Sequence, residues 1–157
     1  MPHILVICTA NICRSPVVHA VLQEKFDAQQ MTGWTVSSAG TWTENGYKAA
    51  SYSTQLMAER GLDLSAHRSQ LVTAEAIAAA DLVLCMESGH VEALRAEFPD
   101  HADRVFLLSE MAGKQYSVAD PYGRPLEAYQ LMVREVSELI EQGWPRIVEL
   151  ALEREKQ

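Results

Sequence analysis

The stretch that decides the fold is residues 2–17, PHILVICTANICRSPV, in which an apolar run leads through a polar loop into a helix signal. The aliphatic run at residues 4–7 has no polar alternation, which is typical of a strand buried on both faces. Ser15 and Pro16 predict a helix start, with Ser15 as the N-cap and Pro16 at the first helical position. Apolar residues then recur at helical spacing and would cover one face of a sheet: Val17, Val18, Val21, Leu22 and Phe26.

The rest of the chain repeats this alternation of strand and helix patterns. Three further segments predict strands: Trp34-Thr35-Val36-Ser37 and two apolar runs at residues 82–86 and 105–108. The order of elements predicts an α/β fold with three layers, in which a four-stranded, parallel, twisted sheet carries helices on both faces. Because no linker or repeat interrupts it, we expect residues 1–157 to form a single domain.

The expected helices lie between and after these strands. One covers about residues 46–60, and a second follows the run at residues 82–86 and ends at Pro99. A C-terminal helix begins near Leu126. Gly143 and Pro145 are expected to interrupt it before a last helical stretch.

Composition excludes several classes of protein. The 157 residues have a formal net charge of −8, which argues against binding to nucleic acid or to an anionic membrane. The N-terminus does not have the pattern of a signal peptide, and no apolar run is long enough to span a membrane, so no membrane insertion is expected. The 3 cysteines suit a reducing compartment, so we expect a cytoplasmic protein. We also expect it to be a monomer. The 5 histidines are scattered, and neither a metal nor another cofactor is expected.

Residues 8–15, CTANICRS, join the first strand to the first helix, where an open α/β sheet places its ligand. Backbone N–H groups of so tight a loop can converge on one anion, helped by the positive end of the helix. Arg14 adds a planar fork that can hold two phosphate oxygens. The same surroundings would stabilise Cys8 as a thiolate nucleophile below a bound phosphorus atom. Taken alone, Cys8 would be interpreted as a buried core residue and Arg14 as a surface charge. Their combination in this loop instead predicts a phosphate-binding site with a cysteine nucleophile.

The motifs of the chain, taken in order, resemble those of the low-molecular-weight protein-tyrosine phosphatases. Members of that family carry Cys-x-Gly-Asn-Ile-Cys-Arg-Ser-Pro near the N-terminus, and residues 8–16 read Cys-Thr-Ala-Asn-Ile-Cys-Arg-Ser-Pro. Three shorter motifs continue the resemblance over nearly the whole chain: Ser38-Ala39-Gly40-Thr41, Ser65-Ala66-His67-Arg68-Ser69 and Asp120-Pro121-Tyr122.

The resemblance implies hydrolysis of phosphotyrosine in proteins through a phosphocysteine intermediate on Cys8. Arg14 would hold the equatorial oxygens, and Asp120 would protonate the departing phenol and then activate water. Without the other motifs, residues 120–123 would read as a turn, because Pro and Gly occupy turn positions. Ser15 would hydrogen-bond the thiolate besides capping the helix.

By the same resemblance the other loop residues, Thr9, Ala10, Asn11, Ile12 and Cys13, surround the phosphate. Asn11 would prop the loop open, assisted by Ser38 and His67, although His67 alone reads equally well as a structural histidine. Cys13 is either a filler or a redox partner whose reversible disulfide with Cys8 prevents irreversible oxidation. Ala10 replaces the usual Gly, so a positive φ there would strain the loop.

Substrate choice depends on the walls of the cleft. Ile12, Trp42 and Tyr122 are candidate walls for an aromatic ring, and each could equally be ordinary packing. A deep phosphate site is within reach of a phenol but not of a short serine side chain, so we expect tyrosine-phosphorylated proteins as partners. Related arginine phosphatases typically carry Thr where Ile12 stands. Gly123 weakens the tyrosine interpretation, because tyrosine-directed members commonly have a larger residue there.

Other activities on similar scaffolds remain as alternatives. An arsenate reductase would need two further cysteines to relay oxidation, and only Cys85 is available, in a predicted strand. A protein-arginine phosphatase on the same fold is the second alternative. A sugar-transport phosphocarrier would not need Arg14 together with Asp120, and a non-enzymatic binding module would have lost Cys8 or Asp120.

Overall fold

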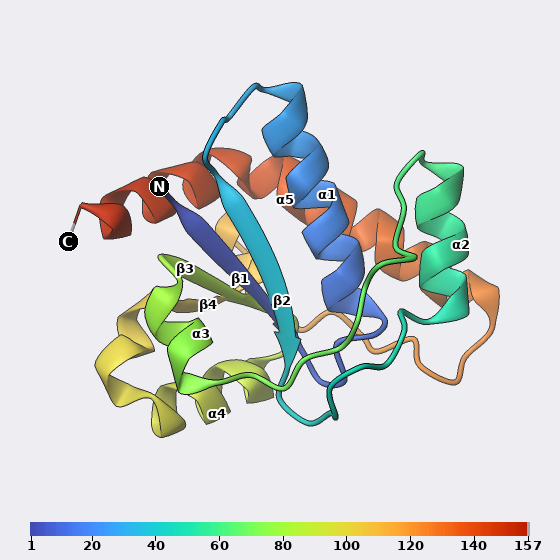
Figure 1. Ribbon diagram of the computed structural model, residues 1–157, viewed down its shortest axis with the longest axis horizontal. Coiled ribbons are helices and arrows are strands. Elements are labelled where there is room, and N and C mark those ends of the chain that lie inside the picture. Colours follow the sequence, from blue (N-terminus) through green and yellow to red (C-terminus); the bar gives the residue numbers. More distant parts are fainter. Residues whose placement is uncertain (157) are drawn as a thin grey trace.

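The computed structural model describes residues 1–156 and is built on a four-stranded parallel sheet (Figure 1). The strands are β1 (His3–Cys8), β2 (Thr35–Gly40), β3 (Leu82–Cys85) and β4 (Val105–Leu107). Their order across the sheet is β2-β1-β3-β4. The predicted four-stranded parallel α/β sheet is therefore confirmed.

Helices cover both faces of the sheet, as predicted. On one face, helices α1 (Arg14–Ala28) and α5 (Leu126–Glu155) bury one set of alternating strand residues: Ile4, Val6, Leu82 and Leu84. On the other face, α3 (Ala74–Ala79) and α4 (Ser88–Glu97) cover the opposite set: Leu5, Ile7, Val83 and Cys85. Both faces of β1 and β3 are buried, which explains why their sequences show no polar alternation.

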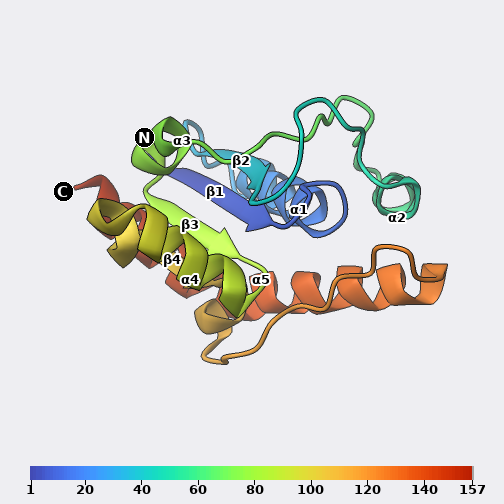
Figure 2. The same ribbon diagram turned by 90° about the horizontal axis from the view of Figure 1, so that it is seen from below.

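Three shorter elements complete the chain: α2 (Ser51–Glu59) and the 3₁₀ helices η1 (Pro99–Arg104) and η2 (Leu108–Ala112). Helix α2 packs against α1 and α5. In Figure 2, α2 and the first turns of α5 lie at the end toward which the strands point. Both termini lie at the opposite end, where the amino group of Met1 pairs with Glu155.

Two predicted helix starts are wrong. Helix α1 begins at Arg14, so Ser15 lies inside its first turn and is not the N-cap. The N-cap residue is Cys13, whose side chain makes no capping hydrogen bond. Helix α2 begins only at Ser51, because the segment before it is held to other loops. There, the N–H of Tyr47 donates to Ser69 Oγ and the N–H of Ala50 donates to the Ile12 carbonyl.

The predicted interruption of the C-terminal helix is also wrong, because α5 runs through Pro145 without a break. The buried residues Ile140 and Ile147 hold both halves of α5 in the core, which offsets the one hydrogen bond that Pro145 cannot donate. Gly143 has a packing role instead. A Cβ atom at Gly143 would lie 2.6 Å from Cβ of Met111, so glycine lets α5 approach η2 closely.

The order of the strands fixes where a ligand can bind. From β1 the chain passes to β2 on one side of the sheet, and it later enters β3 on the other side of β1. Such a switch point leaves a crevice outside the carboxyl ends of the two central strands. The loops that follow β1 and β3 therefore meet at this crevice.

Candidate active site

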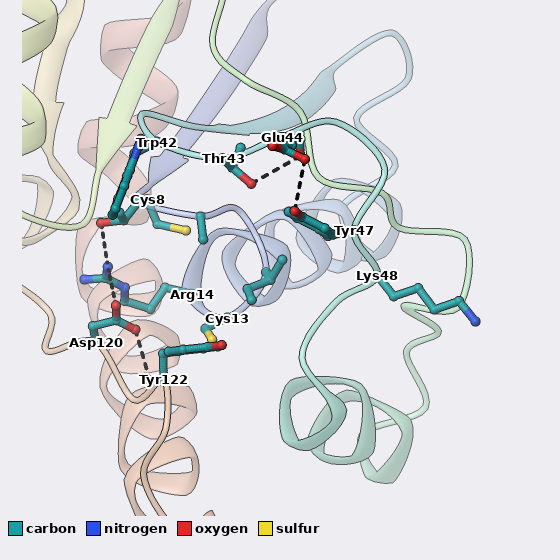
Figure 3. A pocket seen from close by; sticks show the side chains of 13 residues that line it. Cys8, Cys13, Arg14, Trp42, Thr43, Glu44, Tyr47, Lys48, Asp120 and Tyr122 are labelled. Carbon is teal, nitrogen blue, oxygen red and sulfur yellow. Dashed lines mark hydrogen bonds and ion pairs between the residues drawn. The ribbon is translucent and has the colours of Figure 1, made fainter.

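A pocket of about 800 Å³ opens at this crevice (Figure 3). Its floor is formed by residues of the loop 8–14, which we call the phosphate loop. Its walls come from the segment 42–48 and from Asp120 and Tyr122. Cys8 is only 2% exposed, yet it borders the pocket at the end of β1. The structure thus brings together residues from two separate motifs of the sequence, at 8–16 and 120–122, with the segment 42–48 between them in the chain.

A chain of hydrogen bonds fixes the surroundings of the Cys8 sulfur. The N–H of Gln70 donates to Asn11 Oδ1 over 2.9 Å, which turns Asn11 Nδ2 toward Ser15, where it donates to Oγ over 2.7 Å. Because Ser15 Oγ accepts that bond, its own proton is free to point at Cys8 Sγ, 3.0 Å away. The Ser15 hydroxyl therefore hydrogen-bonds the Cys8 sulfur and does not cap the helix.

Asn11 also sets the shape of the phosphate loop. Its φ of 61° lies in the left-handed region, and its carbonyl accepts a 2.7 Å hydrogen bond from His67 Nε2. Burial lowers the pKa of His67, while the bond to Asn11 opposes that shift. Ser38 is hydrogen-bonded among the described residues to His19 instead, with 3.4 Å between Oγ and Nδ1. The structure thus joins His67, but not Ser38, directly to Asn11.

Ala10 does not adopt the strained backbone that a replaced glycine suggested. The positive φ of the phosphate loop belongs to Asn11, and Ala10 lies outside the left-handed region. Close approach is required at Gly40 instead, where a Cβ atom would lie 2.5 Å from the Thr9 carbonyl oxygen. Glycine at the end of β2 lets the next segment lie against the loop, and the N–H of Trp42 donates to that carbonyl.

Arg14 is 1% exposed and presents one edge of its guanidinium to the pocket. Its Nη1 atom is held from behind by the Val118 carbonyl at 2.7 Å and by Glu87 Oε2 at 2.9 Å. On the other edge, Nε is buried without a hydrogen-bond partner among the described residues. Nη2, on the same edge as Nε, has only longer contacts, 3.4 Å to Thr9 Oγ1 and 3.6 Å to Asp120 Oδ2. Such an edge fits two oxygens of a phosphate.

Asp120 lies beside this edge in an exposed loop. Its Oδ1 accepts a 3.1 Å hydrogen bond from the N–H of Tyr122, so the motif does form a turn. Its Oδ2 points toward Arg14 (Figure 3). Asp120 therefore both forms a turn and places a carboxyl group at the pocket.

Aromatic side chains form part of the pocket walls. Trp42 and Tyr122 are 83% and 67% exposed, so neither belongs to the core, and both border the pocket with Ile12. Tyr47 was not foreseen, and its hydroxyl donates to Glu44 Oε2 over 3.1 Å. In Figure 3, Lys48 points away from the centre of the pocket. The three predicted wall residues thus do reach the same cavity.

The sequence analysis did not single out Glu87, which caps α4 after β3, or His90, in the first turn of α4, and both contact the site. His90 Nε2 lies 2.9 Å from Thr9 Oγ1 and 3.4 Å from Glu87 Oε2. A signal was available, because polar residues directly after a central strand fall at the carboxyl edge of the sheet.

The other two cysteines differ in position. Cys13 Sγ lies 3.5 Å from the Tyr129 hydroxyl, and burial raises the pKa of Cys13 to about 11. Cys85 is completely buried in β3, and burial raises its pKa as well. Cys13 borders the pocket, whereas Cys85 has no access to it.

Within residues 1–156, no group of three or more His, Cys, Asp and Glu side chains is arranged to hold a metal ion. None of the helices in this same range is long and apolar enough to cross a membrane.

Comparisons with known proteins agree with this geometry. Residues 3–157 match the family model described as low molecular weight phosphotyrosine protein phosphatase. A probable low-molecular-weight protein-tyrosine-phosphatase, EpsP, from Ralstonia nicotianae is 38% identical over 148 residues, covering 92% of this chain and 94% of that protein. A protein-arginine-phosphatase from Geobacillus stearothermophilus is 37% identical, and the match covers 90% of this chain and 93% of that protein. The crystal structure of a low-molecular-weight protein tyrosine phosphatase from T. tengcongensis superposes with a TM-score of 0.87 at 35% identity. The match covers 93% of this chain and 99% of that one.

Proposed function

Since the chain belongs to the low-molecular-weight phosphotyrosine protein phosphatase family, we propose that it hydrolyses phosphotyrosine in proteins through a phosphocysteine intermediate on Cys8. The observation that carries the proposal is that Cys8 and Arg14 line one pocket together with Trp42 and Tyr122, and that Nε of Arg14 has no hydrogen-bond partner among the described residues.

In the first step, the Cys8 thiolate attacks phosphorus while Nε and Nη2 of Arg14 hold two non-bridging oxygens. The bond between phosphorus and the phenol oxygen breaks, and protonated Asp120 gives its proton to that oxygen. The first turn of α1 has no acidic residue, so the positive helix end and Arg14 both stabilise the charge that develops on the phosphoryl group.

In the second step, water attacks the phosphocysteine. Asp120, now a carboxylate, accepts a proton from the water, and the Cys8 thiolate leaves with inorganic phosphate as the other product. The hydroxyl of Ser15, 3.0 Å from Cys8 Sγ, donates a hydrogen bond to the departing thiolate. This bond lowers the barrier because the sulfur gains negative charge as it leaves.

The second candidate function is a protein-arginine phosphatase, favoured by the relative from Geobacillus stearothermophilus. Ile12 and the aromatic residues Trp42 and Tyr122 favour a phenol, because they offer an apolar surface against which its ring can pack. Asp120 and Glu44 are the acidic groups that could instead accept hydrogen bonds from phosphoarginine.

The test is hydrolysis of three peptides that differ only in the phosphorylated residue, phosphotyrosine, phosphoserine or phosphoarginine, without added metal. We expect turnover of phosphotyrosine to exceed the other two and to be lost in Cys8→Ser. Cys85→Ala is the matched control, because that thiol lies outside the pocket. A preference for phosphoarginine would establish the second candidate, and turnover by Cys8→Ser would refute the covalent mechanism.

We propose further that the protein acts on tyrosine-phosphorylated proteins as a monomer in the cytoplasm. Its 3 cysteines are free thiols, as a reducing compartment requires. Light scattering of the purified chain checks the monomer, and fractionation of cells that express it checks the location.

A further inference from the structure

His90 lies at the start of α4 and contacts Thr9 and Glu87, two of the partners of Arg14, and it is almost completely buried, with 6% of its surface exposed. Its Nδ1 atom accepts a 3.2 Å hydrogen bond from the N–H of Glu87, the residue that caps the helix. Its Nε2 atom lies 2.9 Å from Thr9 Oγ1. The imidazole therefore spans the loops that follow β3 and β1.

The hydrogen bonds assign a proton to each atom of this cluster. Because Nδ1 accepts from a backbone N–H, a neutral imidazole must carry its proton on Nε2 and donate it to Thr9 Oγ1. Burial lowers the pKa of His90, which favours that neutral form. The Thr9 hydroxyl then accepts from His90 and from Arg14 Nη2, and it donates to Glu87 Oε2 over 3.5 Å. Its one proton and two lone pairs are all used.

We propose that His90 is a positioning residue for phosphate binding: its Nε2–H holds Thr9 and Glu87, which together fix the guanidinium of Arg14 with its open edge toward the pocket. Glu87 Oε2 holds Nη1 from behind, and Thr9 Oγ1 limits the movement of Nη2. Without the Nε2 donor, Thr9 loses its shortest side-chain contact and Arg14 gains freedom before phosphate arrives. Phosphate must then order the guanidinium itself, which weakens binding.

Two substitutions separate the two ends of the imidazole. In His90→Asn, the amide oxygen can replace Nδ1 at the Glu87 N–H, but the side chain is too short to reach Thr9. In His90→Gln, the terminal amide nitrogen can replace Nε2 and donate to Thr9. A role confined to capping α4 predicts that Asn is the better replacement, whereas the positioning role predicts that Gln is.

The experiment measures kcat and KM for p-nitrophenyl phosphate, the inhibition constant of inorganic phosphate, and Tm for these variants. We expect His90→Asn to raise the phosphate inhibition constant and KM about tenfold, as for the loss of one hydrogen bond in a charged cluster. His90→Gln should remain within about threefold of the unmodified protein, which is under 1 kcal/mol. His101→Asn, in η1, is the control for the same chemical change away from the pocket.

Thr9→Val provides a second variant that leaves the cap of α4 intact and removes only the hydroxyl. It should weaken phosphate binding as His90→Asn does, and the double variant should be no weaker than either single one. Unchanged phosphate inhibition in Thr9→Val, additive effects in the double variant, or better phosphate binding by His90→Asn than by His90→Gln would each overturn the proposal. The inference rests on the proposed function, but the two fail differently: an inactive unmodified protein refutes the function, whereas an active one with unaffected variants refutes only the role of His90.

Discussion

Nη1 of Arg14 lies 2.9 Å from Oε2 of Glu87, so the arginine that faces the pocket is anchored by a carboxylate on its far side. Glu87 is 38% exposed, whereas Arg14 is 1% exposed. Solvent therefore screens the acid more than the guanidinium, and the main effect of Glu87 is to hold Arg14 in position. The pairing leaves the edge with Nε and Nη2 available for phosphate.

Removing this anchor should reduce activity. We expect Glu87→Ala to lower kcat/KM for p-nitrophenyl phosphate about tenfold, equivalent to about 1.4 kcal/mol after allowance for solvent screening. Glu87→Gln keeps an oxygen that can accept from Nη1, so its loss should be smaller. Steady-state kinetics of both variants measures the difference, and equal activity in Glu87→Ala and the unmodified protein would show that the Val118 carbonyl alone suffices.

Asp120→Ala should affect poor leaving groups most. Phenol needs a proton as it departs, whereas p-nitrophenol leaves readily as an anion. We expect a loss of about 10²–10³-fold with phenyl phosphate and a clearly smaller loss with p-nitrophenyl phosphate. The dependence of kcat on the pKa of the leaving group should therefore steepen in the variant. A uniform loss across leaving groups would assign Asp120 to binding through Arg14 Nη2 and not to proton transfer.

Oxidation of the protein should be reversible only while Cys13 is present. Peroxide converts the Cys8 thiolate to a sulfenate, reducing the peroxide to water. Attack by the Cys13 sulfur then forms a disulfide and releases the sulfenic oxygen as water. Because burial raises the pKa of Cys13 to about 11, Cys13 should react after Cys8 rather than before it. We expect dithiothreitol to restore activity in the unmodified protein but not in Cys13→Ser; recovery in both would exclude the disulfide.

Stability should decrease as the pH falls below 7. Burial lowers the pKa of His19 from 6.5 to about 4, and burial also lowers the pKa values of His3, His67 and His90. Between the folded and unfolded pKa values the unfolded chain binds more protons, so the free energy of unfolding rises with pH. The shift of His19 corresponds to at most about 3 kcal/mol, lost progressively between pH 7 and pH 4.

Thermal unfolding at pH 7 and at pH 5 measures this effect. We expect Tm to fall on acidification, and the fall to be smaller in His19→Gln, which has no proton to gain there. His101→Gln is the control and should keep the full pH dependence. An identical pH dependence in His19→Gln and the unmodified protein would contradict the contribution of His19.

The sequence by itself determined the local parts of the protein. The run at residues 4–7, the loop at residues 8–15 and the apolar helix that follows are encoded by neighbouring residues, so their patterns can be read directly. The motifs also identified the residues that meet in the pocket, because Cys8, Arg14 and Asp120 occur at recognisable positions. Local rules failed where distant contacts override them, as at Pro145, which a long buried helix accommodates.

Only the tertiary structure decided which loops lie beside the phosphate loop. Glu87 and His90 reach Thr9 across 78 and 81 residues of chain, and no local pattern encodes that contact. It follows from the strand order β2-β1-β3-β4, which places the end of β3 next to the end of β1. Strand order depends on how all the helices pack on both faces at once, and periodicity within one segment carries no information about it.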